Sequence, residues 1–254
     1  MKKTYLIANW KMQLNKSDSV RLAVEVAKNY NHNNNLEIIL APSFTALTDV
    51  RRKLKNSNIK LASQNVFYHE KGQYTGEISP IQLKELSVEY VIIGHSERRQ
   101  YLHETDEDIN KKIKIVLENG LIPIVCVGET MNERQDNKTD LVLIRQVSKA
   151  LEDIKLDNEK LIIAYEPVWV IGTGQAVGPQ EAEHAVEVIK YNLLENFSEE
   201  NLKNNIHIIY GGSVDAENIN DFLKIDLISG ALVGGASLNA DKFLNIIKKI
   251  TNNQ

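Results

Sequence analysis

The segment Leu161-Ile-Ile-Ala-Tyr-Glu-Pro-Val-Trp-Val-Ile-Gly-Thr-Gly174 joins a short apolar run to a loop with a stiff start and a flexible end. The run Leu161–Ala164 is too short for a helix and predicts a buried strand. Pro167 fixes its own φ and favours extended backbone at Glu166, whereas the glycines at the far end can absorb large φ/ψ changes. This pattern predicts a hinged flap. The predicted flap comprises Pro167, Val168, Trp169, Val170, Ile171, Thr173 and Gly174.

Glu166 lies where the predicted strand meets the flap, which makes it a candidate general base. Loss of hydration makes a carboxylate a stronger base, so a Glu beneath a water-excluding flap suits proton abstraction. The alternative is a strand-end Glu paired with a surface Lys, beside a loop whose Trp169 only packs against the protein. For one Glu alone the alternative is favoured, and the rest of the chain has to decide.

Apolar runs typical of strands recur along the whole chain. Most of them are continuous rather than alternating, as expected for strands that are covered on both faces. The predicted strands are Tyr5–Ala8, Ile38–Ala41, Ile59–Ala62, Tyr90–Ile93, Ile122–Val127, Leu161–Ala164, Ile206–Ile209 and Leu227–Val233.

Amphipathic segments separate these runs and predict helices. Ser17 is expected to cap the first helix, which runs to about Asn29 and buries Val20, Ala23, Val24 and Ala27. Eight strand–helix units in succession predict the α/β class, with a parallel sheet closed into a (β/α)8 barrel and residues 1–254 as a single domain. The other predicted helices are Thr45–Lys55, Pro80–Leu86, Asp106–Asn119, Thr139–Leu151, Pro179–Glu195, Asp215–Leu223 and Asp241–Ile250.

The composition narrows the class of partner. The 254 residues carry a formal net charge of -4, which argues against nucleic acid or an anionic membrane but allows a small anionic substrate. The one cysteine, Cys126, excludes an internal disulfide and has no basic neighbour in sequence, so we interpret it as core filling rather than as a nucleophile. No Cys/His set has metal-ligand spacing, so we expect no metal. Without a membrane-length apolar run or a signal-peptide core, we expect a cytoplasmic protein.

Polar residues at the carboxyl ends of barrel strands meet at one mouth. The first predicted strand brings Asn9, an amide donor, and Lys11, a cation suited to an anionic ligand. The fourth brings His95 to the start of a helix, whose dipole favours the neutral imidazole. Neutral imidazole can donate a hydrogen bond to a carbonyl oxygen. A solvated Lys and a satisfied strand-end His are the commoner cases when each residue is taken alone.

The residues that follow His95 are expected to support the site. Glu97 is either a buried partner of Lys11 or an acid in a first helical turn, and Ser96 lies next to it. Arg98 and Arg99 are expected to form structural ion pairs with Glu104 and nearby acids rather than to contact a substrate.

Two glycine pairs follow the last two predicted strands, in Tyr210-Gly-Gly-Ser213 and Val233-Gly-Gly-Ala236. Glycine lets backbone N–H groups approach a ligand closely, and a helix N-terminus favours an anion. Either pair alone is equally consistent with a tight turn. Together, at adjacent strand ends, they predict a phosphate site.

The predicted mouth suits proton abstraction beside the carbonyl of a small phosphorylated sugar. It would combine a carboxylate, a neutral imidazole, a Lys, an Asn and the phosphate site. No cofactor is needed, because the base can return the proton.

The chain resembles the triosephosphate isomerase family over its whole length, and the family's (β/α)8 fold is the TIM barrel. The motifs that carry the resemblance are Ala8-Asn-Trp-Lys11, Gly94-His-Ser-Glu-Arg-Arg99, Ala164-Tyr-Glu-Pro-Val-Trp169, Ile171-Gly-Thr-Gly174, Tyr210-Gly-Gly-Ser213 and Val233-Gly-Gly-Ala236. Triosephosphate isomerases are themselves a standard example of barrel active sites, of tuned acids and bases and of loop gating.

The resemblance implies the interconversion of dihydroxyacetone phosphate and D-glyceraldehyde 3-phosphate through an enediolate, in glycolysis and gluconeogenesis. It implies that Glu166 moves the proton, that His95 is the neutral electrophile, and that Lys11 and Asn9 stabilise negative charge. Glu97 would support Lys11. The groups expected to hold the phosphate are the N–H groups of Gly172, Ser213, Gly234 and Gly235.

A long loop from Gln64 to Glu77 is, from the residues alone, a mobile surface loop. The resemblance implies that it enters a second subunit of a homodimer, where Thr75 and Gly76 lie near the partner's Asn9 and Lys11.

The chain departs from the family at the end of the flap. The family usually has Gly-Lys-Thr-Ala there, whereas this chain has Gly174-Gln-Ala-Val177, and Val170 replaces a usual Ala. This departure bears on loop motion rather than on the chemistry. Two alternatives remain: a paralogous isomerase for a tetrulose phosphate, and a non-catalytic barrel that binds phosphometabolites.

Overall fold

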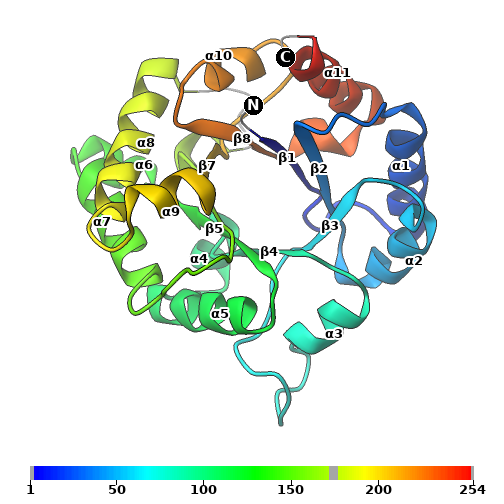
Figure 1. The fold of residues 1–254 in the computed structure, drawn as a ribbon, viewed down its shortest axis with the longest axis horizontal. Helices are drawn as coiled ribbons and strands as arrows, with labels where there is room; N and C mark the ends of the chain where they lie inside the picture. Colours follow the sequence, from blue (N-terminus) through cyan, green and yellow to red (C-terminus); the bar gives the residue numbers. More distant parts are fainter. Residues whose placement is uncertain (1–2, 172–176, 253–254) are drawn as a thin grey trace.

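Eight parallel strands close into a barrel in the computed structural model, which describes residues 3–171 and 177–252. Each strand pairs with the next along the chain, and β8 pairs with β1, so the sheet has no free edge. The predicted (β/α)8 barrel is confirmed (Figure 1). The strands are β1 (Thr4–Asn9), β2 (Leu36–Ala41), β3 (Lys60–Ser63), β4 (Tyr90–Ile93), β5 (Ile122–Val127), β6 (Leu161–Tyr165), β7 (Ile206–Tyr210) and β8 (Ile228–Val233).

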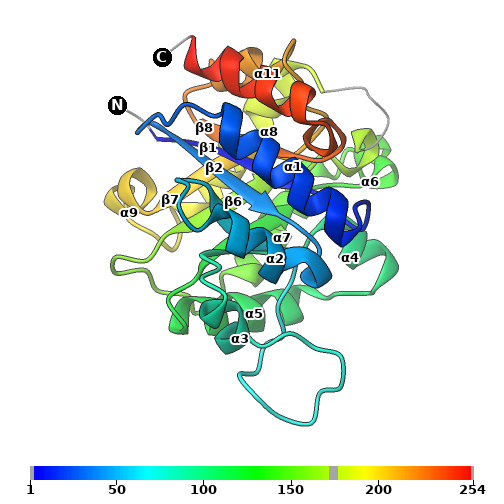
Figure 2. The same ribbon diagram turned by 90° about the vertical axis from the view of Figure 1, so that its right-hand side faces the viewer.

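Helices surround the barrel (Figure 1). In Figure 2 the strands point toward the end that carries α4 and α6, and α9 lies at the opposite end. None of the helices in the described residues is long and apolar enough to cross a membrane. The helices are α1 (Lys16–Asn29), α2 (Phe44–Leu54), α3 (Pro80–Glu85), α4 (Ser96–Tyr101), α5 (Asp106–Glu118), α6 (Met131–Gln135), α7 (Thr139–Ala150), α8 (Pro179–Leu193), α9 (Glu199–Asn204), α10 (Ile219–Leu223) and α11 (Ala240–Thr251), with 3-10 turns η1 (Val168–Val170) and η2 (Gly235–Leu238).

The start and the buried face of α1 differ from the prediction. Asn15, not Ser17, caps the helix, because its side chain accepts the N–H of Asp18. The buried residues are Ser19, Leu22, Ala23 and Val26, whereas Val20, Val24 and Ala27 are only partly buried. Apolar residues occupy most of the circumference of α1, so periodicity alone could not orient it.

Other helix boundaries differ for local reasons. The helix predicted over Asp215–Leu223 is α10, which starts at Ile219. It starts later because the Asp215 carboxylate accepts the N–H groups of Glu217 and Asn218 in a turn. The helices α6 and α9 were not predicted, and for α4 only the start at His95 was predicted. Each has five or six residues, which is too short for a periodic pattern.

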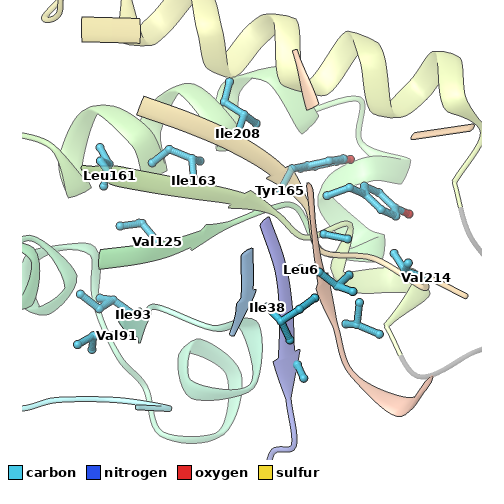
Figure 3. Close-up of a cluster of buried hydrophobic side chains, with 14 of the residues drawn as sticks. Leu6, Ile38, Val91, Ile93, Val125, Leu161, Ile163, Tyr165, Ile208 and Val214 are labelled. Carbon is cyan, nitrogen blue, oxygen red and sulfur yellow. The ribbon is translucent and has the colours of Figure 1, made fainter. Parts of the chain in front are cut away.

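Successive strand residues alternate between two buried layers. Leu6, Ile38 and Val91 face outward and pack with apolar side chains of the helices, and Figure 3 shows part of this layer. Their neighbours Ile7 and Ile39 belong to a separate cluster that fills the barrel interior. Both faces of the sheet are therefore apolar, which confirms the interpretation of the continuous runs as strands covered on both sides.

A polar cluster closes the amino-terminal end of the barrel around Glu37. The carboxylate accepts a hydrogen bond from the Tyr90 hydroxyl and pairs with Lys3. Burial alone would raise the pKa of Glu37, but the hydrogen bonds from Lys3 and Tyr90 and the positive charge of Lys3 together lower it. Burial and the Glu37 charge raise the pKa of Tyr90, so the phenol remains a donor.

This cluster makes stability depend on pH. Because the pKa of Glu37 is lower in the folded state, its contribution is present above the ordinary carboxyl range and is lost as the pH falls through the lowered pKa. We expect Glu37→Gln to reduce the free energy of unfolding near neutral pH by about 1–3 kcal/mol and to flatten its acid dependence. Urea unfolding across acid and neutral pH measures both. Glu89→Gln, at a more exposed carboxylate paired with Lys60, is the control. Identical pH profiles for the two variants would contradict the assignment.

Candidate active site

The strand pattern brings Asn9 and Glu166 to the same mouth. Side chains of β1 and β6 alternate between the layers, and Ile7 and Ala164 face the barrel interior. Asn9, two residues after Ile7, ends β1, and Glu166, two residues after Ala164, directly follows β6. Because strand side chains alternate with a period of two, both point to the same side as the interior residues. A cavity of 570 Å³ opens at this point, and Ile171 and Leu232 form part of its wall. Other lining residues include Asn9, Lys11, His95, Glu166, Gly211, Gly212, Ser213, Gly234 and Gly235.

Glu166 is almost completely buried, with 1% of its surface exposed. The backbone N–H of Ser96 donates to Oε2 at 3.0 Å. Nε2 of His95 lies 3.1 Å from Oε1, yet Oε1 has no well-aligned hydrogen bond in the described part of the chain. A short distance without alignment does not make a hydrogen bond, so Oε1 is an unsatisfied acceptor. A buried carboxylate oxygen without a donor is well suited to accept a proton.

Two glycines create the space that Glu166 occupies. A Cβ at Gly128 would lie 1.7 Å from the Glu166 carbonyl oxygen, and a Cβ at Gly211 would lie 2.9 Å from its Cγ. Gly211 also donates its N–H to the Tyr165 carbonyl at 2.7 Å. The predicted reason for Gly211, a close approach of backbone to ligand, is therefore incomplete, because its missing side chain makes room for the base.

His95 is the N-cap of α4, as the sequence predicted for a residue at a helix start. Its Nδ1 accepts the N–H of Glu97 at 3.2 Å. An accepting Nδ1 carries no proton, so this contact assigns the proton of the neutral ring to Nε2. Nε2 is the nitrogen that faces Glu166, and it is therefore available as a hydrogen-bond donor in the cavity.

Lys11 is held by three contacts at the cavity edge. Its backbone is left-handed, with φ of 51°, and its N–H donates to Asn9 Oδ1 at 3.0 Å. Gln64 donates to the Lys11 carbonyl at 2.9 Å, a positioning role that the sequence did not reveal. Nζ pairs with Glu97 Oε1 at 2.7 Å. Glu97 is both the partner of Lys11 and a first-turn acid of α4, but its side chain is 42% exposed, so the expectation of a buried partner is wrong.

The arginines and Cys126 lie outside the reacting groups. Arg98 pairs with Glu104 at 3.2 Å and Arg99 with Asp106 at 2.5 Å, as expected of structural ion pairs. Burial and the neighbouring Glu166 carboxylate raise the pKa of the Cys126 thiol, which lies in the interior cluster beneath the base and remains a neutral core side chain. Among the described residues no group of His, Cys, Asp and Glu has the arrangement of a metal site.

The glycine turns border the same cavity. Ser213, Gly234 and Gly235 line it, and η2 begins at Gly235. Of the hydrogen bonds found in the described residues, none uses the N–H of Ser213, Gly234 or Gly235 as donor, while the Gly234 carbonyl accepts from Ser237. These N–H groups can therefore bind an anion. Gly172, also predicted to hold phosphate, lies outside the described residues, as do Thr173, Gly174, Gln175 and Ala176.

In the described part of the flap, residues 167–171, the segment Val168–Val170 forms the turn η1. Trp169 donates its Nε1–H to Glu129 at 2.8 Å, and the Tyr165 hydroxyl lies 3.3 Å from the same carboxylate. Burial raises the pKa of Glu129. The hydrogen bonds from Trp169 and Tyr165 lower this pKa and so offset part of the effect of burial. No role for Glu129 was predicted, although its position directly after Cys126-Val-Gly128 indicates that it lies at the mouth.

Arg134 connects the flap to the helix that follows it. Its guanidinium lies 4.2 Å from the centre of the Trp169 ring, and Nη2 lies 2.5 Å from Glu181 Oε1 in α8. We expect Arg134→Ala to leave the indole less ordered, because a cation–π contact and an ion pair are worth about 1 kcal/mol each near a surface.

The expected result of Arg134→Ala is a fall in kcat of roughly two- to tenfold, with Trp169 emission shifted to the red. Tryptophan fluorescence suits the test, because the only other tryptophan, Trp10, is 1% exposed. Arg145→Ala is the control, since Arg145 makes only long ion pairs, of 3.7 Å and 4.0 Å. Unchanged emission and kcat in Arg134→Ala would contradict a role in holding the flap.

Comparisons with known proteins agree with this geometry. Residues 4–250 match the family model described as triosephosphate isomerase. A triosephosphate isomerase of Dictyoglomus thermophilum is 46% identical over 252 residues, covering 98% of this chain and 100% of the relative. One from Caldanaerobacter subterraneus subsp. tengcongensis is 45% identical, covering 97% and 99%. One from Fusobacterium nucleatum subsp. nucleatum is 43% identical, covering 98% and 99%.

Proposed function

The chain belongs to the triosephosphate isomerase family and is an isomerase of triose phosphates; from that premise we propose that Glu166, His95, Lys11 and Asn9 carry the reaction. The observation that supports this assignment is the pair Glu166 and His95, 3.1 Å apart at the cavity and beside the two glycine turns. The reaction interconverts dihydroxyacetone phosphate and D-glyceraldehyde 3-phosphate.

The proposed steps move one proton between neighbouring carbons. The Glu166 carboxylate removes a proton from the carbon beside the carbonyl, and His95 Nε2–H donates to the carbonyl oxygen as negative charge develops on it. The charge of Lys11 and the amide of Asn9 stabilise the enediolate. Glu166 then returns the proton to the neighbouring carbon. His95 gives its Nε2 proton to the former carbonyl oxygen and takes up the hydroxyl proton of the other oxygen, which becomes the new carbonyl. The reaction is balanced without a cofactor, and we propose that none is used.

The substrate phosphate is proposed to bind the N–H groups of Ser213, Gly234 and Gly235, with Gly172 contributing from the flap. Ser96 and Glu97 are proposed as positioning residues, because Ser96 N–H orients Glu166 and Glu97 contacts both His95 and Lys11. Substrate must displace Glu166 from His95, since both groups have to face the reacting carbons.

A coupled assay of triose-phosphate turnover by the purified protein tests this function. Wild-type protein without turnover would contradict it. Greater catalytic efficiency on a tetrulose phosphate would favour the paralogous isomerase, although the relatives described above carry the triose name. Tight triose-phosphate binding without exchange of solvent hydrogen would favour a non-catalytic barrel.

We further propose that the protein acts as a homodimer. The loop between β3 and α3 projects from the body in Figures 1 and 2, with Thr75 and Gly76 exposed. Aromatic contacts stiffen it, including stacked His69 and Tyr74 rings 4.8 Å apart, so the interpretation as a merely mobile loop is less favoured. A second cavity, of 580 Å³, lies beside Asn9 and Lys11. A partner's loop would cover this cavity and the exposed side chains at its edge, Met12, Tyr101 and Leu102.

Thr75→Arg tests the assembly. We expect it to shift sedimentation toward the monomer and to lower activity by about tenfold or more, because an arginine inserted into a packed contact cannot be accommodated. Asn158→Arg, in an exposed loop elsewhere, is the matched control and should change neither property. An unchanged sedimentation profile for Thr75→Arg would refute the role proposed for the loop.

A place in glycolysis and gluconeogenesis, in the cytoplasm, is proposed from the nature of the substrate. We also propose that residues 1–254 work as one domain, with no nucleic acid or membrane among the partners.

A further inference from the structure

A large cavity lies at the end of the barrel opposite the catalytic mouth. It has a volume of 1000 Å³, within the usual range for small-molecule sites. The ends of α8 and α9 and the starts of β7 and β8 form its walls, on the side where Figure 2 shows α9. None of its lining residues lines the mouth, so the established chemistry does not account for it.

Positive charge gathers in this cavity, although the chain as a whole is acidic. Its lining contains four lysines against two acidic residues, Glu199 and Asp226, whereas the chain carries a net charge of -4. One of the four, Lys3, is engaged by Glu37. The other three, Lys160, Lys190 and Lys203, form no ion pair with the described residues. The cavity therefore has cationic groups to offer to an anion.

Helix ends explain only part of this charge. Lys190 and Lys203 lie in the last turns of α8 and α9, where a cation offsets the helix dipole. Lys160 lies in no helix; it directly precedes β6. Its presence at the same cavity is not accounted for by helix stability.

The remaining walls are apolar and aromatic. Leu193, Leu202 and Ile206 line the cavity, and Leu193 and Ile206 also belong to the buried core. The Tyr191 ring, 67% exposed, lies at the same cavity. His207 also lines the cavity, and its ring packs against the buried Tyr5 ring, with centres 4.8 Å apart. Such walls favour a flat apolar ligand body over a purely hydrated ion.

We propose that this cavity binds a small aromatic anion. The ring would lie against Tyr191 and the leucines, and a phosphate or carboxylate would lie among Lys160, Lys190 and Lys203. Phosphate and carboxylate are both anions that accept hydrogen bonds from a lysine ammonium group. Which of the two head groups the cavity prefers is therefore decided by comparing ligands that carry one or the other.

Isothermal titration calorimetry on the full chain tests the proposal with three probes: 1-naphthyl phosphate, 1-naphthoate and neutral 1-naphthol. Each titration is run at constant ionic strength with and without inorganic phosphate, which competes for the catalytic mouth. We expect the anions to bind more tightly than 1-naphthol, with affinity falling as salt is raised. The better of the two anions identifies the preferred head group.

Two variants locate the binding. Lys160→Ala and Lys190→Ala should each weaken binding of the better anion by roughly two- to fivefold, as for a single exposed charge pair, and the double variant by more. Lys249→Ala, an exposed lysine of α11 that does not line the cavity, should bind like the wild type. Circular dichroism confirms that each variant folds, and isomerase turnover should be unchanged in all of them.

No binding of either anion at about 1 mM, equal binding of 1-naphthol, or affinity that is insensitive to both lysines would overturn the proposal. Binding that inorganic phosphate abolishes and that neither lysine variant weakens would place the probe at the mouth and would also overturn the proposal. Because binding is measured without turnover, its failure is distinct from a failure of the isomerase assay.

Discussion

Replacing Glu166 by Gln is expected to lower kcat by about 10²–10⁴-fold, because the amide cannot accept the substrate proton. The substitution should leave the local structure intact. The amide oxygen can still accept the Ser96 N–H, which lies 3.0 Å from Oε2, and the volume left free by Gly128 and Gly211 suits either side chain. The loss should therefore appear in kcat and kcat/KM alike, as for an interaction made in the transition state.

A coupled assay with each triose phosphate measures this loss, and exchange of solvent hydrogen into substrate measures proton abstraction directly. Glu89→Gln is the matched control, since the same change is made at a more exposed carboxylate paired with Lys60. Turnover within about twofold of wild type in Glu166→Gln would remove Glu166 as the base and leave the cavity without one.

The second large effect is expected at His95. His95→Asn should lower kcat by about 10²–10³-fold, because the shorter amide cannot bring a donor to the position of Nε2. In the structure Glu97 N–H donates to Nδ1 at 3.2 Å and so keeps the ring proton on Nε2, 3.1 Å from Glu166. The asparagine could still cap α4, so folding should be retained.

Comparison with His184→Asn separates this effect from a general cost of losing a histidine. His184, in α8, is exposed and contacts Asp140 at 2.9 Å, and it does not line the catalytic cavity, so its variant should turn over normally. A fall confined to KM in His95→Asn would assign His95 to substrate binding alone and would contradict its role as electrophile.

Much of the fold was predictable because the strands of such a barrel are continuous apolar runs that are easily recognised in the sequence. Runs such as Ile122–Val127 are apolar on both faces, since one face meets helices and the other fills the interior. The phase of α1 was not predictable, because apolar residues surround most of that helix. The short helices α6 and α9 were not predictable, since a helix of five or six residues shows no periodicity.

The candidate site was predictable as a set of residue types. Asn9, Lys11, His95 and Glu166 each stand at or just after a strand, and parallel strands bring such positions to one mouth. The sequence did not predict a role for Glu129, Arg134 or Gln64. A carboxylate, a cation and an amide are ordinary side chains outside the strands, and nothing in the local sequence marks them. Only their contacts with Trp169 and with the Lys11 carbonyl give them a role.

The sequence alone determined which groups could react and at which end of the barrel they would lie, because residue identity and strand order are local properties of the chain. Tertiary structure decided the distances. Ser96 and Glu166 are 70 residues apart in the chain, yet the Ser96 N–H lies 3.0 Å from the Glu166 carboxylate. That contact depends on barrel closure and on the register between strands, which are non-local. The space at Gly211 and the lysine cavity at the opposite end have the same origin, since each is formed by elements that meet only when the barrel closes.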